Sequence, residues 1–245
     1  MSASGILRSA KRRQSKLRSP LTSWIDRKHP LPARFYTPGH VDIPDDKWAT
    51  WLGLEEVSPL HLADSLEWLG LKESRRITAQ YLSDAGSLIS GLSGAWLDGE
   101  EREWILEDLG APPEPCLPIY IITTGDGNSE QAVYIGKSKT NSRFSGGHSA
   151  ALKLHAPVYR RLRKRIYRCS IWFHDNRDYI ALEWMEPESL ALEFLDSIES
   201  QLIFKFKPPL NTLKKNNYCA TKPVLLHIQN FSGRRFIDDT IISPY

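Results

Sequence analysis

The chain has 245 residues, of which 41% are hydrophobic and 25% are charged, and its formal net charge is +3. This length suits one large domain or two small ones, and the composition excludes a wholly disordered chain. No apolar run approaches the roughly 18 residues that a membrane span needs. Three cysteines without a CxxC pair exclude a disulfide framework and a thiolate zinc site, so a cytoplasmic setting is the simplest expectation. The Arg- and Ser-rich start leaves an organellar transit peptide as the alternative.

The positive charges are concentrated in two parts of the sequence. Residues 1–25 contain six basic and no acidic residues, and residues 131–174 contain ten basic and no acidic residues. Such separation favours a surface that binds phosphates, with a solvated basic helix face as the alternative. The expected nucleic-acid contacts are Lys137, Lys139, Arg160, Arg161, Arg163, Lys164 and Arg165.

The N-terminal half predicts a basic disordered arm over residues 1–20 and a mostly helical domain over residues 21–110. Ser58 and Pro59 are a good cap and first turn for one helix, and residues 75–92 continue with helical spacing. Asp98 can cap a third helix, which Gly110 ends. Five of the eight tryptophans lie in this segment, so we expect it to have its own core and a possible role in recognition.

A proline-rich linker over residues 111–116 precedes a change of pattern. Residues 117–124 and 132–135 predict a β-hairpin, residues 149–165 a helix, and residues 168–173 and 179–184 two further strands. A helix follows over residues 187–206, and residues 224–228 predict one more strand. This order favours a small α+β domain over residues 117–212, with residues 213–245 as a C-terminal extension docked on it.

The hairpin brings two tyrosines together. Tyr120 and Tyr134 lie on neighbouring strands and can share one face, although each is also a common kind of half-buried core residue. Arg143 lies in a loop before the predicted helix, where a bidentate guanidinium suits phosphate binding. His148 follows beside two glycines.

Glu199 is the most informative single residue. On a helical wheel it falls within the apolar arc of the helix over residues 187–206, whereas Glu193, Asp196 and Ser200 fall on the opposite face. A carboxylate on an apolar stripe costs several kcal/mol unless it is compensated. A divalent cation and a salt bridge to Arg143 are equally suitable compensations. The arc consists of Leu190, Leu192, Phe194, Leu195, Ile198, Leu202, Ile203 and Phe206.

Taken in order, these elements resemble the GIY-YIG nuclease family over residues 117–212. The resemblance rests on PIY at 118–120, YIG at 134–136, Arg143, His148, the glutamate of IESQLI and the asparagine of PPLN, which are Glu199 and Asn211. It implies a central antiparallel sheet flanked by helices. Pro118 stands where the family name has glycine, at a position that does no chemistry.

The resemblance implies hydrolysis of a phosphodiester with one Mg²⁺ or Mn²⁺ ion. Tyr120 would be the general base, and Tyr134 and His148 would ease its deprotonation, since a free phenol has a pKa of about 10. Arg143 would stabilise charge on the phosphate, Glu199 would hold the metal, and Asn211 would support the site. His148 follows Arg143 by five residues where related members often show four, so His155 and Lys137 are alternatives for its role.

Two functions remain open at this point. The first is an endonuclease, with DNA favoured over RNA, and the resemblance is compatible with a restriction or defence role and with a homodimer on the substrate. The second is a nucleic-acid-binding or protein-interaction module on an inactive nuclease scaffold, supported by the basic stretch from Arg160 to Arg168 with its interleaved tyrosines. The intact Tyr120, Arg143 and Glu199 argue for the first.

Overall fold

The computed structural model describes residues 19–31, 49–66, 68–89, 96–139, 149–175 and 178–244. The basic arm over residues 1–18, Trp48, Arg143 and His148 lie outside the described residues.

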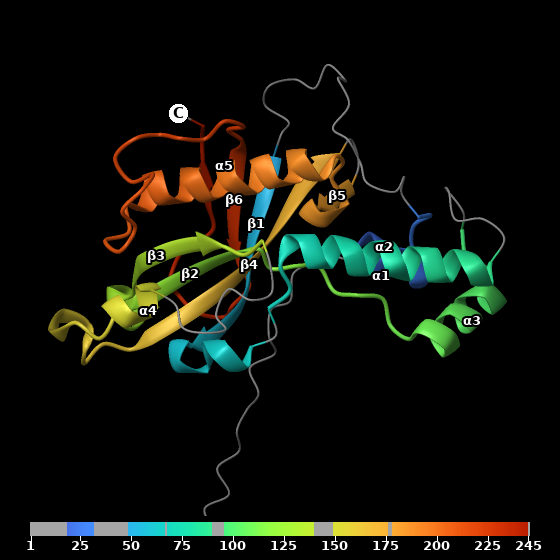
Figure 1. Ribbon diagram of the computed structural model, residues 1–245, viewed down its shortest axis with the longest axis horizontal. Coiled ribbons are helices and arrows are strands. Elements are labelled where there is room, and N and C mark those ends of the chain that lie inside the picture. Colours follow the sequence, from blue (N-terminus) through green and yellow to red (C-terminus); the bar gives the residue numbers. More distant parts are fainter. Residues whose placement is uncertain are drawn as a thin grey trace, which may run out of the picture.

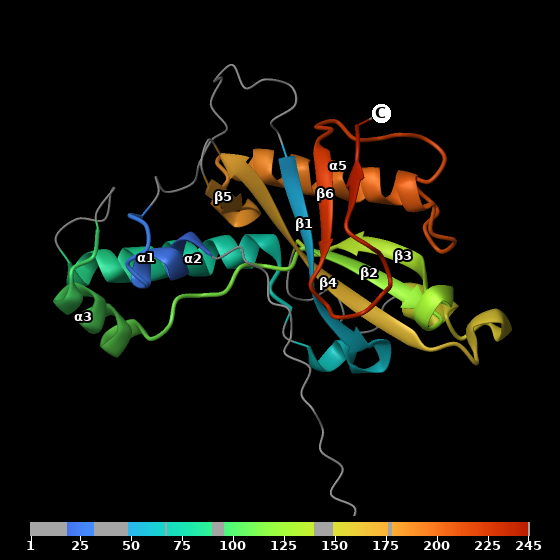
Figure 2. The same ribbon diagram turned by 180° about the vertical axis from the view of Figure 1, so that it is seen from behind.

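The described strands form one seven-stranded sheet with the order β3-β2-β4-β1-β6-β7, and β5 pairs with β4 beside this path. Figure 1 and Figure 2 show the sheet from its two sides. The β1–β6 pair is parallel, and the other pairs are antiparallel. The predicted α+β class is confirmed. The strands are β1 (Ala49–Pro59), β2 (Ile119–Thr124), β3 (Gln131–Lys137), β4 (Lys164–Asp175), β5 (Asp178–Ala181), β6 (Leu225–Asn230) and β7 (Thr240–Ile242).

The helices lie at different parts of this sheet. In Figure 1, α5 runs along the sheet, whereas α1, α2 and α3 extend away from it on the side remote from the β2–β3 hairpin. None of the helices in the described ranges has the length and apolar character needed to cross a membrane. The α-helices are α1 (Pro20–Ile25), α2 (Leu71–Leu88), α3 (Gly99–Leu109), α4 (Ser149–Lys153) and α5 (Glu188–Phe206). The 3-10 turns are η1 (Leu60–Ser65), η2 (Gly127–Ser129), η4 (Pro157–Tyr159) and η5 (Leu182–Trp184).

Three apolar clusters hold these elements together. The first fills the space between α5 and the sheet, and Ile119 and Ile121 of β2 belong to it. The second joins α1, α2 and α3 to β5 and η5. The third contains η1, α4 and the alternate side chains of β2, namely Tyr120 and Ile122. Successive side chains of a strand point to opposite faces, so β2 contributes to a core on both of its sides.

The N-terminal half differs from the expected separate helical domain. Residues 49–59 form β1, which pairs with β4 on one side and with β6 on the other. Leu52 and Leu54 of β1 are fully buried in the cluster beneath α5, which also contains Leu71 of α2. The C-terminal extension likewise enters the sheet through β6 and β7. Residues on both sides of the linker therefore share strands and cores.

The helix predicted over residues 149–165 was wrong for most of its length. The helix α4 ends at Lys153, η4 begins at Pro157, and β4 begins at Lys164. Pro157 has no backbone N–H to donate within a helix. From Ile166 onward the residues alternate between two buried faces, as a strand requires. The basic stretch from Arg160 to Arg168 is therefore divided between a loop and a strand.

The helices α3 and α5 were predicted correctly, whereas the helix expected after Ser58 and Pro59 was wrong, because these residues end β1 and the 3-10 turn η1 follows. Asp98 accepts a hydrogen bond from the Glu101 backbone N–H at 2.8 Å, and the Glu101 carboxylate accepts one from the Asp98 backbone N–H at 3.0 Å. This reciprocal cap fixes the start of α3. The helix α5 begins after Pro187 and ends before Lys207, in agreement with the apolar pattern.

A buried carboxyl joins the linker to η5. The Cys116 backbone N–H donates to Glu183 Oε1 at 3.1 Å, and the Cys116 thiol donates to Oε2 at 3.3 Å. Arg75 of α2 donates to the backbone carbonyls of Glu183 and Met185. Burial raises the pKa of Glu183 to about 7, above the ordinary value of 4.5.

We predict that Glu183 makes the stability of the protein fall with rising pH. In the unfolded chain this carboxyl ionises near pH 4.5, whereas in the folded chain it keeps its proton up to about pH 7. The free energy of unfolding should therefore decrease between these values, by about 3 kcal/mol in total. Glu183→Gln should remove this dependence, as measured by urea unfolding at pH 5 and pH 8. The exposed Glu107→Gln is the control, and a wild-type slope that persists in Glu183→Gln would contradict the assignment.

Candidate active site on the β2–β3 hairpin

The two predicted tyrosines share one face of the hairpin. The rings of Tyr120 and Tyr134 are stacked with centroids 6.0 Å apart and planes 26° apart. Tyr120 is fully buried, whereas Tyr134 is half-buried. The Trp68 ring meets the Tyr120 ring edge-on at 5.7 Å, and the Trp68 indole N–H donates to the Ala63 carbonyl at 2.8 Å. Tyr134 is therefore the member of the pair that solvent or a substrate can reach.

Gly136 makes room for this pair. It faces Tyr120 in the β2–β3 register. A Cβ atom on Gly136 would lie 2.4 Å from Tyr120 Oη, 2.5 Å from Tyr120 Cζ and 2.9 Å from Tyr134 Cε1. These distances are far below van der Waals contact, so the position of the Tyr120 ring requires glycine here.

A row of register partners continues from Gly136 across the sheet. Tyr120 faces Arg168 of β4, and Arg168 faces Glu56 of β1. Side chains of such partners lie on the same face. The Arg168 guanidinium forms an ion pair with Glu56 and lies 5.5 Å from the Trp68 ring centroid. Arg168 thus fixes Trp68, which in turn packs against Tyr120.

Glu199 belongs to a cluster of four charged side chains. Its Oε2 atom lies 3.0 Å from Lys137 Nζ and 2.8 Å from Lys214 Nζ. Asp196 pairs with the same two lysines, at 3.1 Å for Lys214. Burial lowers the pKa of Lys137, and the negative charge of Glu199 opposes this shift. The cost of placing Glu199 on a largely apolar helix is therefore offset by two ammonium groups.

The tyrosine pair and the Glu199 cluster lie on the two faces of the hairpin. Lys137 is the residue after Gly136, so its side chain leaves β3 on the α5 side, while Tyr120 lies on the other side. The strand β3 is the edge strand of the sheet. The two groups therefore flank one edge strand, whose outer side is hydrogen-bonded to Leu210 and Asn211.

Asn211 holds the edge of β3. The Ile135 backbone N–H donates to Asn211 Oδ1, and Asn211 Nδ2 donates to the Ile135 carbonyl, each at 2.9 Å. The Leu210 backbone N–H also donates to the Val133 carbonyl at 2.9 Å. Asn211 therefore acts as a one-residue strand partner, which positions the hairpin relative to α5.

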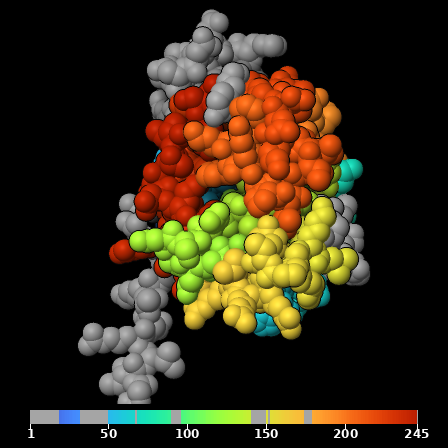
Figure 3. All heavy atoms as spheres, turned by 90° about the vertical axis from the view of Figure 1, so that its left-hand side faces the viewer, coloured from blue at the N-terminus to red at the C-terminus, as the bar shows by residue number. Residues whose placement is uncertain are grey.

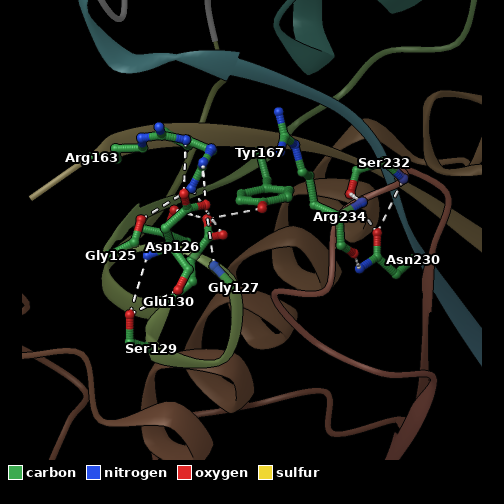
Figure 4. Close-up of polar contacts among 12 residues, drawn as sticks. Gly125, Asp126, Gly127, Ser129, Glu130, Arg163, Tyr167, Asn230, Ser232 and Arg234 are labelled. Atoms are coloured by element: carbon green, nitrogen blue, oxygen red, sulfur yellow. Dashed lines mark hydrogen bonds and ion pairs between the residues drawn. The ribbon is translucent and has the colours of Figure 1, made fainter. Parts of the chain in front are cut away.

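Several of the expected nucleic-acid contacts are bonded within the protein. Figure 4 shows Arg163 and Tyr167 beside the turn that contains Asp126 and Glu130. Arg165 is buried and pairs with Asp126 at 2.7 Å and with Glu130 at 3.0 Å. Arg163 pairs with Asp126 at 2.8 Å. These contacts fix the β2–β3 turn to β4.

The other expected contacts divide into bonded and exposed groups. Lys164 Nζ donates to the carbonyls of Tyr159 and Leu162 at 2.7 and 3.2 Å, so it closes the loop before β4. The exposed residues are Lys139, Arg160 and Arg161.

The remaining predicted residues are Arg143, His148 and the two alternatives to His148. Arg143 and His148 lie outside the described residues. Of the two alternatives to His148, His155 is exposed in the turn after α4, and Lys137 contacts Glu199.

Four residues of the site were missed by the sequence analysis. Asp196 was placed on the face of α5 opposite Glu199, yet both residues bind the same lysines. Their spacing of three residues along a helix was a usable signal. Lys214, Arg168 and Trp68 come from distant segments, and only the strand register brings Arg168 to Tyr120.

The Glu199 cluster also suits a divalent metal ion. The carboxylates of Asp196 and Glu199 converge on the ammonium groups of Lys137 and Lys214. Hard carboxylate oxygens are the ligands that Mg²⁺ takes, with water at its other positions. Within the described ranges no group of three or more His, Cys, Asp and Glu side chains could hold a metal. Asp196 and Glu199 are the two carboxylates that this cluster offers to an ion, and both are paired with lysines.

We predict that Gly136→Ala destabilises the protein. The added methyl group would force the Tyr120 ring out of its packed position, at a cost of about 2 kcal/mol. The melting temperature should fall by roughly 5 °C. Gly99→Ala is the matched control, because its Cβ would meet only Arg27 Nη1 at 3.7 Å. Equal melting temperatures for the two variants would contradict the close contact with Tyr120.

Comparisons of the chain with protein-family models, curated proteins and solved structures give no match.

Proposed function

We propose that this protein is a divalent-metal-dependent nuclease that hydrolyses phosphodiester bonds, with DNA as the preferred substrate. The observation that carries the proposal is the arrangement around Gly136. On one side a stacked tyrosine pair lies against this glycine, and on the other side the next residue, Lys137, binds the Glu199 carboxylate. Hydroxyl, ammonium and carboxylate groups at one strand edge are suited to phosphate chemistry.

The exposure of the tyrosines divides their roles. Tyr134 is half-buried and can meet the attacking water, whereas the fully buried Tyr120 holds the Tyr134 ring by stacking. A positioned tyrosine hydroxyl can orient water, and its tyrosinate form can take the proton of that water. In this proposal Tyr134 contacts the water and, as tyrosinate, takes its proton, while Tyr120 supports the Tyr134 ring by stacking.

The cation and carboxylate groups act on the phosphate. Lys137 and Lys214 are donors that can move from the carboxylates to phosphate oxygens. Glu199, with Asp196 beside it, would hold the Mg²⁺ or Mn²⁺ ion. Such an ion stabilises the charge on the leaving 3′ oxygen. Asn211 keeps β3 in place relative to α5 through its two bonds to Ile135.

A second candidate function is nucleic-acid binding without cleavage. Two observations favour it: Tyr120 is fully buried, and Glu199 is already neutralised by two lysines. A scaffold of this kind would keep the basic surface and need no metal. The two functions differ in whether the chain cuts its ligand.

We predict that cleavage depends on Tyr134 and Glu199. Plasmid DNA, circular single-stranded DNA and folded RNA would be incubated with Mg²⁺, Mn²⁺ or chelator. Tyr134→Phe should lower the rate at least about 100-fold, because it removes the hydroxyl that contacts the water. Glu199→Gln should abolish metal-dependent cutting. Tyr120→Phe should lower the cleavage rate less than Tyr134→Phe does, because it keeps the ring stack.

Matched controls are available for both changes. Glu193→Gln alters an exposed carboxylate of α5, and Tyr179→Phe removes a hydroxyl on β5. Both should cut like the wild type. Tight binding of a substrate with no cutting under any metal would support the second candidate function instead. Cutting that survives Glu199→Gln would exclude this residue as the metal ligand.

Metal binding can be measured without any cleavage. Because the ammonium group of Lys214 occupies the space between Asp196 and Glu199, it should compete with a divalent ion. Lys214→Met should strengthen Mn²⁺ binding about tenfold, as measured by electron paramagnetic resonance of free Mn²⁺. Adding Glu199→Gln should reverse the gain. Unchanged Mn²⁺ affinity in Lys214→Met would place the ion elsewhere.

A further inference from the structure

The segment around α4 and η4 exposes three aliphatic side chains. Leu152 and Val158 are each 71% exposed, and Leu162 is 42% exposed. Val158 and Leu162 line an open cavity of about 560 Å³, together with Pro157, Arg160 and Arg161. A cluster of exposed aliphatic groups on a small surface marks a place of contact with another molecule. We name residues 152–162 the α4–η4 surface.

The charge of this surface is not neutralised within the described part of the chain. Arg160 and Arg161 are exposed and have no acidic partner among the described residues, and the same holds for Lys153. Arg163 and Arg165, which follow directly, are paired with Asp126. Of the four arginines in residues 160–165, the two without an acidic partner among the described residues therefore border the cavity, where they can bind phosphate.

The α4–η4 surface adjoins the candidate active site. Leu154 of this surface and Ala150, which precedes it in α4, pack in the same cluster as Tyr120, with Tyr134 and Tyr159 at its margin. Figure 3 shows residues 149–163 (yellow) on the surface next to the β2–β3 hairpin (green). A chain bound at α4–η4 can thus extend toward Tyr134.

We propose that the α4–η4 surface binds a single-stranded segment of nucleic acid, with an unstacked base in the cavity. This inference rests on the nucleic-acid substrate of the proposed function. A duplex presents phosphates outward but keeps its bases stacked inside, so it would neutralise the arginines and leave the aliphatic groups exposed. A single strand offers both phosphates and base faces, which can cover Val158 and Leu162. The cavity volume lies in the range of small-ligand sites.

An anionic membrane also offers negative charge and apolar groups to a protein. The shape of the α4–η4 surface nevertheless favours nucleic acid. Membrane-surface helices are long and have one continuous apolar face. Here α4 contains five residues, and the aliphatic groups Val158 and Leu162 lie around a cavity with arginines at its border. Vesicles of anionic lipid therefore serve as a separate arm of the test.

Binding is measured by fluorescence anisotropy with the full chain carrying Glu199→Gln, in chelator, so that no cutting occurs. The probes are a 20-nucleotide DNA strand, an RNA strand of equal sequence, the DNA duplex, and vesicles with one-third phosphatidylserine. Single strands should bind at least tenfold more tightly than the duplex. Val158→Ser should weaken single-strand binding about tenfold and leave duplex binding unchanged.

The charge variants have a different signature. Arg160→Gln combined with Arg161→Gln should weaken binding to strand and duplex alike. The slope of log affinity against log salt for single strands should decrease by about 1.4, since each phosphate contact contributes about 0.7. Val158→Ser should leave this slope unchanged. Leu213→Ser, at a 77% exposed leucine, and Arg76→Gln, at an arginine paired with Glu73, are the controls and should bind normally.

Equal affinity for strand and duplex, with no effect of Val158→Ser, would overturn the proposal. Binding to vesicles that Val158→Ser abolishes, without binding to either strand, would also overturn it in favour of a membrane contact. The nuclease proposal can fail independently. In that case the wild-type chain would bind single strands normally but would not cut them.

Discussion

The antiparallel pairing of β1 with β4 is the contact on which the whole sheet depends. Without it the sheet would separate into β2, β3, β4 and β5 on one side and β1, β6 and β7 on the other. This pairing joins residues more than 100 positions apart, for example Leu52 and Ile171, so the chain must order a long loop before it forms. The cluster beneath α5 draws on both parts of the sheet and favours their association. The geometry of the candidate site is thereby tied to segments far outside the hairpin.

Glycine at position 136 is the local constraint that organises the candidate site. It allows the Tyr120 ring to lie against the backbone of β3, and this ring then determines where Tyr134 and Trp68 pack. On the other face, Lys137 is fixed by the same strand and reaches Glu199. The two groups of side chains are thus coupled through one edge strand. Asn211 adds to this coupling, because it binds both backbone groups of Ile135.

The sequence predicted those features that depend on nearby residues. The cap at Asp98, the start of α5 after Pro187 and the tyrosine pair on a hairpin follow from turn residues and short-range spacing. The strand β1 was not predicted, because its stability comes from two strands that lie far away in the sequence. The partners of Glu199 were missed for the same reason: Lys214 approaches α5 only after the chain has turned back at Asn211.

The distribution of charge acquires a different meaning in the folded chain. A run of basic residues in the sequence suggested one continuous phosphate-binding face. In the folded chain, the alternation of side chains along β4 and the contacts of the β2–β3 turn place these residues in different environments. Arg165 and Lys164 became internal cross-links, since burial requires that their charges be paired or hydrogen-bonded. Among residues 160–165, the arginines without an acidic partner in the described part of the chain are Arg160 and Arg161, which border a cavity in the exposed loop before β4. Net positive charge therefore marks a region of the sequence, whereas among the four arginines of residues 160–165 only Arg160 and Arg161 have no acidic partner in the described part of the chain.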